Sequence, residues 1–184
     1  MNGLLTESLA LFVSMVFAAA GLTKVAAWRA LPAVVQNFRI LPGWLVLPAS
    51  ILLPPLEILI ATGILLARTR MWAAALAAIL FAVFGAALAI NLYRGRRQID
   101  CGCFRSDLRQ PISAAVVLRN LMLVLCALVV LTGSGAATLS PFAWALASGG
   151  AITLFLCYAS LGLLFQAAPP SYEDNFHAYQ SSAS

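Results

Sequence analysis

Two cysteines one residue apart, Cys101 and Cys103 within Asp100-Cys-Gly-Cys-Phe104, are the residues of this chain best suited to chemistry. In an extended backbone, residues i and i+2 point to the same side with Cα atoms about 6 to 7 Å apart, the outer range of a disulfide. The ring that such a bond closes is very small, and strain of this kind raises the reduction potential. Gly102 removes a Cβ where the backbone must bend tightly. The pattern predicts a labile redox disulfide rather than a structural one.

Other interpretations of the pair are weaker. Two ordinary loop residues without a chemical role remain the plain alternative. A structural zinc site needs four ligands, whereas the chain has a single histidine, His177, and no second closely spaced cysteine pair. An iron–sulfur cluster is excluded by the same lack of further ligands. We therefore expect no metal at Cys101 and Cys103.

The two remaining cysteines lie inside apolar runs. Cys126 is expected to be a small apolar residue of a helix. Cys157 falls nearer the level of Cys101 and Cys103, so it is a candidate resolving thiol, although buried apolar packing is the favoured interpretation.

The elements that must position these thiols are membrane helices. The chain has 184 residues, of which 62% are hydrophobic and 9% charged, against roughly 45 to 50% and about 25% in soluble domains. The predicted fold is an all-α polytopic membrane bundle (1–168) with a polar C-terminal tail (169–184). Five spans of the roughly 20 residues that a bilayer requires are expected, with four as the alternative; they are placed at about 4–27, 44–67, 71–93, 112–132 and 141–166. The first run lacks a basic n-region and a cleavage site, which favours a retained helix.

The arrangement of charge gives conflicting evidence about sidedness. The net charge of +5 lies mostly between the apolar runs, which indicates membrane topology rather than nucleic-acid binding. Eight basic residues fall on the side of the cysteine loop and two on the other, namely Lys24, Arg29, Arg39, Arg94, Arg96, Arg97, Arg105 and Arg109 against Arg68 and Arg70. By the positive-inside rule the cysteine loop is cytoplasmic. Disulfide chemistry instead favours the periplasmic side of a bacterial inner membrane, and both assignments stay open.

Polar residues inside the spans form a second group of candidates. A lone carboxylate such as Glu57 is costly in an apolar helix, so it is a functional candidate by default. Lys24 is expected either to reach the headgroups or to pair with Glu57. Arg119 and Asn120 are placed to hold a quinone carbonyl, a thiolate or Glu57, or alternatively to join neighbouring helices. Asn91 is interpreted as a packing or interface residue.

Five short motifs together carry a family resemblance: Gly21-Leu-Thr-Lys24, Leu53-Pro-Pro-Leu-Glu57, Asn91-Leu-Tyr-Arg94, Asp100-Cys-Gly-Cys-Phe104 and Leu118-Arg-Asn-Leu121. The chain resembles the MauE family of methylamine-utilisation proteins, within the wider group of MauE/DoxX-like redox-associated membrane proteins. The Cys-Gly-Cys-Phe element is the most specific of the five. The others recur more widely in the group.

The resemblance implies a role in maturing the β (small) subunit of methylamine dehydrogenase, a disulfide-rich periplasmic protein, with a thioredoxin-like partner, MauD. It implies Cys101 and Cys103 as the redox pair, with Lys24, Glu57 and Arg119 in support. A membrane quinone near Arg119 is the candidate cofactor, by loose analogy with other membrane thiol oxidoreductases.

One position departs from the family pattern. Arg105 stands where the family usually has glycine, which bears on whether the client is methylamine dehydrogenase or another protein. Two non-redox alternatives also remain. One is a membrane scaffold for maturation factors or a client, and the other is a small transporter.

Overall fold

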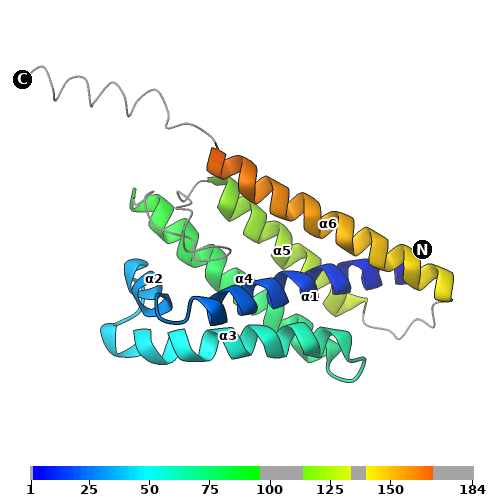
Figure 1. Cartoon of the computed structure of the whole chain (residues 1–184), viewed down its shortest axis with the longest axis horizontal. Helices are drawn as coiled ribbons and strands as arrows, with labels where there is room; N and C mark the ends of the chain where they lie inside the picture. The colour runs from blue at the N-terminus through cyan, green and yellow to red at the C-terminus, as the bar shows by residue number, and fades with distance from the viewer. Residues whose placement is uncertain (1, 96–113, 134–139, 168–184) are drawn as a thin grey trace, which may run out of the picture.

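The computed structural model describes residues 2–95, 114–133 and 140–167, and within them the chain is entirely helical. Six helices follow one another: α1 Asn2–Ala26, α2 Leu31–Asn37, α3 Gly43–Leu65, α4 Arg70–Tyr93, α5 Ala114–Thr132 and α6 Pro141–Ala167 (Figure 1). All except the short α2 are long and apolar enough to cross a membrane. The predicted all-α bundle with five spans is therefore confirmed. The C-terminal tail (169–184) lies outside the described residues.

The helices pack around α1. This helix contacts α3, α5 and α6, while α4 runs along α5 and also contacts α3. Figure 1 shows α3 below α1 and α6 above it. The rings of Phe17 on α1 and Phe81 on α4 lie 4.5 Å apart between centroids, and Phe12 meets Tyr158 of α6 edge to face at 6.0 Å. The core thus joins α1 to both sides of the bundle.

Helix α3 continues through three prolines, Pro48, Pro54 and Pro55. Each proline lacks the N–H that would bond the carbonyl four residues earlier, so Pro54 and Pro55 free the carbonyls of Ser50 and Ile51. Such breaks are tolerated in membrane helices where neighbouring groups take up the freed backbone. Helix α3 therefore lacks these backbone N–H donors next to the site described below.

The connection between α1 and α3 contains the one short helix, α2. This helix lies in the connection between the first two expected spans. It packs against α3, and Leu31 at its start is buried. Phe38, which follows α2, packs beside Leu88 of α4. The segment therefore bridges the start of α3 and the far half of α4.

Candidate functional site

Lys24 of α1 and Glu57 of α3 form a buried ion pair. The ammonium Nζ donates to both carboxylate oxygens, at 2.6 Å to Oε1 and 2.9 Å to Oε2. The side chains are only 7% and 1% exposed. Of the two expectations for Lys24, the structure shows pairing and not extension to the headgroups. Two opposite charges so placed form a neutral unit, which lowers the cost of having each inside an apolar bundle.

A glycine on α1 makes this pair geometrically feasible. A Cβ at Gly21 would lie 2.9 Å from Cγ1 of Ile58, 3.3 Å from the carbonyl oxygen of Pro54 and 3.4 Å from Cβ of Glu57. Only a residue without a side chain lets α1 and α3 approach this closely. Side chains on a helix tilt toward its N-terminus, so Lys24 reaches back along α1 to the level of Gly21. There the carboxylate of Glu57 accepts both hydrogen bonds from its ammonium group.

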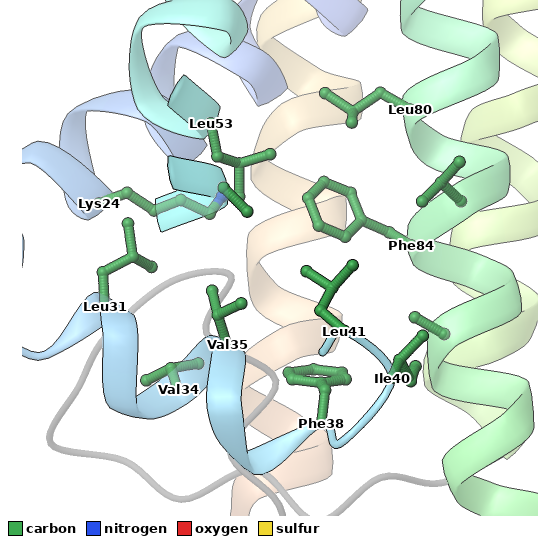
Figure 2. Close-up of a pocket in the computed structure, with 13 residues that line it drawn as sticks. Lys24, Leu31, Val34, Val35, Phe38, Ile40, Leu41, Leu53, Leu80 and Phe84 are labelled. Carbon is green, nitrogen blue, oxygen red and sulfur yellow. The ribbon is translucent and has the colours of Figure 1, made fainter. Parts of the chain in front are cut away.

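An apolar cavity of about 270 Å³ adjoins the ammonium group. Figure 2 shows Lys24 at one end of it, with the ring of Phe84 beside the amine and Phe38 farther away. The amine nitrogen lies 5.6 Å from the centroid of Phe84, within the range of a cation–π contact. The site therefore combines one charged donor with an apolar wall.

A second buried ion pair, between Glu7 of α1 and Arg70 of α4, was not predicted from the sequence. Nη1 of Arg70 lies 2.5 Å from Oε1 of Glu7, and its Nε donates to the carbonyl of Ile64 at 3.0 Å. Arg70 was counted with the loops because it follows the short 66–69 connection. The sequence signal for this pair was Glu7, an acidic residue within the first turns of an apolar run, because a charge in such a run needs a partner.

Arg119 and Asn120 lie on α5, on a different side of the bundle. The guanidinium carbon of Arg119 is 4.7 Å from the ring centroid of Tyr158 on α6. Asn120 is buried. A Cβ added at Gly85 of α4 would lie 3.6 Å from the Cβ of Asn120. Contacts of this kind correspond to the helix-joining alternative. Neither residue lines the cavity beside Lys24.

Asn91 is fully buried near the end of α4. Its Nδ2 donates to the carbonyl of Ala87 at 2.9 Å. Its Oδ1 has no hydrogen-bond partner within the described part of the chain.

Comparison with known proteins identifies the family. The family model described as "Methylamine utilisation protein MauE" matches residues 2–133. Relatives named methylamine utilization protein MauE match most of the chain. The protein of Paracoccus denitrificans is 43% identical over 160 residues, covering 85% of each chain. That of Paracoccus versutus is 40% identical over 83% of each chain. That of Methylorubrum extorquens is 39% identical over 83% of this chain and 77% of its own.

The chain belongs to the MauE family. No solved structure matches it. The match to the MauE model spans α1 to α5. It therefore includes the Lys24–Glu57 pair, the cavity and the Cys101/Cys103 motif, and it stops before α6. Family membership and five apolar helices make this a multi-pass membrane protein of methylamine utilisation.

The cysteines of this MauE protein fall into two groups. Cys101 and Cys103, the predicted redox pair, lie outside the described residues, as does Arg105. Cys126 is half-buried against the core, as expected. Cys157 is exposed, so the expectation of buried packing is wrong for this residue. Helix α6 packs mainly against α1, and much of its surface faces outward.

No cluster of three or more histidine, cysteine, aspartate or glutamate side chains occurs within 2–95, 114–133 and 140–167. The buried carboxylates, Glu7 and Glu57, each face a cation instead. In each pair the carboxylate balances the charge of a buried basic side chain.

Proposed function

We propose that this MauE-family protein is an inner-membrane accessory that matures a disulfide-rich periplasmic client by thiol–disulfide exchange through Cys101 and Cys103. The observation that carries the proposal is a Cys-Gly-Cys motif inside the segment matched by the MauE model. The partner is a thioredoxin-like protein, MauD-like in kind, and the client is the β subunit of methylamine dehydrogenase or a similar protein. The cysteine loop works on the periplasmic side, where disulfides persist.

The exchange moves two electrons without any further reactant. One thiolate of the pair attacks a disulfide of the partner, so that a mixed disulfide forms and one partner thiolate leaves. The second cysteine then attacks the sulfur of its neighbour. The partner is released as a dithiol, and Cys101 and Cys103 become joined. In the reverse direction the same steps pass a disulfide to the partner.

The buried ion pairs support this function by holding the frame. Lys24 and Glu57 tie α1 to α3, and Glu7 and Arg70 tie α1 to α4. Helix α4 precedes the cysteine motif and α5 follows it. Because the ion pairs hold α4 within the bundle, they limit the positions that the cysteine motif can reach.

Serine substitution of single cysteines tests the proposal. We expect Cys101→Ser and Cys103→Ser each to abolish maturation of the client in cells, because both thiols are needed to form and resolve the mixed disulfide. Cys126→Ser and Cys157→Ser are the matched controls and should leave maturation unchanged. The measurement is the amount of correctly disulfide-bonded client. Normal maturation with both Cys101→Ser and Cys103→Ser would contradict thiol exchange and favour a scaffold.

A further inference from the structure

The thiol mechanism makes no use of the cavity beside Lys24. It is enclosed by side chains from α1, α2, the α2–α3 connection, α3 and α4 (Figure 2). Its volume of about 270 Å³ is close to the lower end of the range for small-molecule pockets, about 300 to 1,000 Å³. A space of this size suits a single ring with a short length of chain.

The inner end of the cavity offers a hydrogen-bond donor. An ammonium group has three N–H bonds, and two of those of Lys24 are directed to Glu57. Within the described residues the third meets only the face of Phe84, 5.6 Å away. Lys24 is also the one polar side chain among the described residues that line the cavity. A ligand with an acceptor oxygen at this end would satisfy the donor, whereas plain hydrocarbon would leave it unpaired.

The charge of the site favours a neutral ligand. Glu57 already balances Lys24, so the buried unit carries no net charge. A carboxylate or phosphate entering the cavity would add an unbalanced negative charge near Glu57, which is costly in an apolar setting. The acceptor oxygen is therefore expected to be a carbonyl or an ether.

The walls and the mouth define the rest of the ligand. Phe38 and Phe84 both line the cavity, and aromatic rings favour a planar π system stacked or edge-on against them. Three lining residues are also open to the outside, Val83 at 56% and Ile40 and Leu41 at 40% exposure. These apolar side chains lie on a surface that faces lipid in a membrane protein. A molecule dissolved in the bilayer reaches the cavity through them.

We propose that this cavity binds the head group of a lipid-soluble quinone, with one carbonyl oxygen accepting a hydrogen bond from Nζ of Lys24 and the apolar tail leaving past Val83. The sequence had placed a quinone near Arg119, but Arg119 lies over Tyr158 and does not line the cavity. The proposal concerns binding. It stands independently of thiol exchange at Cys101 and Cys103.

Photolabelling locates the ligand in the full-length protein. The purified chain in lipid nanodiscs is exposed to a short-tailed azido-ubiquinone and the labelled peptides are mapped by mass spectrometry. We expect label on α2, on the segment that follows it, or on α4 near Val83, and competition by unlabelled decylubiquinone. Label confined to α5 and α6 around Arg119 would overturn the proposal.

Two adjacent alanines on α4 provide a matched pair of variants. Ala87 lines the cavity, whereas its neighbour Ala86 is exposed. Ala87→Phe fills the space and is expected to weaken decylubiquinone binding at least about tenfold, while Ala86→Phe leaves it unchanged. Circular dichroism checks that both variants are folded. Equal binding by the two folded variants would contradict the assignment.

The hydrogen bond is tested by removing the charged pair as a unit. The double variant Lys24→Met/Glu57→Leu keeps the site neutral and should bind decylubiquinone about tenfold more weakly. An alkylbenzene of equal tail length, which lacks the carbonyls, should bind the two proteins equally. If the wild type binds the alkylbenzene or phosphatidylcholine as tightly as the quinone, the cavity holds acyl chains and the proposal fails. Unchanged quinone binding by Cys101→Ser/Cys103→Ser is expected, which separates this result from the thiol mechanism.

Discussion

Each charge of Lys24 and Glu57 is tolerated inside the bundle because the other lies within hydrogen-bonding distance. Removing one partner takes the opposite charge away from the other, whereas replacing both by apolar residues removes both buried charges. The same reasoning applies to Glu7 and Arg70. At the scale of the residue, these four buried charged groups act as two pairs.

A double-mutant cycle tests the coupling of Lys24 and Glu57. Lys24→Met alone is expected to lower the free energy of unfolding by about 3 kcal/mol, because the buried carboxylate of Glu57 loses the ammonium group that balances its charge. Lys24→Met/Glu57→Leu should recover most of this loss. The measurement is reversible unfolding in mixed micelles, followed by circular dichroism. Additive losses in the double variant would show that the pair contributes no coupling.

Arg70 binds two different acceptors, the carboxylate of Glu7 and the carbonyl of Ile64. A lysine ammonium is a compact point charge and does not reproduce the fork of the guanidinium. We expect Arg70→Lys to cost about 1 kcal/mol of unfolding free energy, since one hydrogen bond is lost. Arg68→Lys, in the neighbouring connection, is the control. A loss of similar size at Arg68 would contradict the specific role of Arg70.

At the scale of the element, small residues decide how closely the helices approach. Gly21 sets the distance between α1 and α3 and thereby the geometry of the Lys24–Glu57 pair. Gly149 of α6 has no heavy atom within 4 Å of a Cβ placed on it. These two glycines share a helical setting and differ in what surrounds them.

The contrast between the two glycines predicts opposite effects of alanine. Gly21→Ala should destabilise the protein by about 1 to 3 kcal/mol, because the new methyl group meets Ile58 and the backbone of Pro54. Gly149→Ala should be neutral or stabilising by up to about 1 kcal/mol, since alanine favours helix more than glycine does. Thermal unfolding in detergent compares the two. The packing argument fails if Gly21→Ala is as stable as Gly149→Ala.

The helices themselves were predictable, because five apolar runs of bilayer length leave few other folds. The expected span of 44–67 compares with Gly43–Leu65 in the structure, and 71–93 with Arg70–Tyr93. Pairing between helices was less accessible. Lys24 and Glu57 are 33 residues apart, and hydropathy contains no information on the register of one helix against another. Arg70 was assigned to a loop because position along the chain does not reveal that its side chain turns inward.

At the scale of the whole molecule, five spans place the two ends of the bundle on opposite sides of the membrane. The α3–α4 connection shares a side with the start of α1, and the end of α4 and the start of α5 lie on the other. The basic residues are concentrated on that other side. The proposed thiol exchange nevertheless requires it to be periplasmic.

Cysteine accessibility in spheroplasts decides this orientation. In a background of Cys126→Ser/Cys157→Ser, we expect a membrane-impermeant thiol reagent to label Cys101 and Cys103 after reduction and not before. An added Arg68→Cys, with Cys101 and Cys103 replaced by serine, should stay unlabelled until the membrane is permeabilised. The reverse pattern would support the charge rule and contradict a periplasmic site. Labelling of both positions from outside would contradict five spans.

The two ion pairs of α1 also have a consequence for biosynthesis. Helix α1 leaves the ribosome before α3 and α4, and the partner of its lysine follows 33 residues later and that of its glutamate 63 residues later. A charged side chain inside an isolated membrane helix is costly, by about 2.5 to 3.5 kcal/mol at the centre and by less toward the ends, where Glu7 and Lys24 lie. Helix α1 thus has both its charges neutralised only after Arg70 of α4 has been made. Its stable residence in the lipid depends on the arrival of α3 and α4, which makes insertion of these three spans a cooperative event.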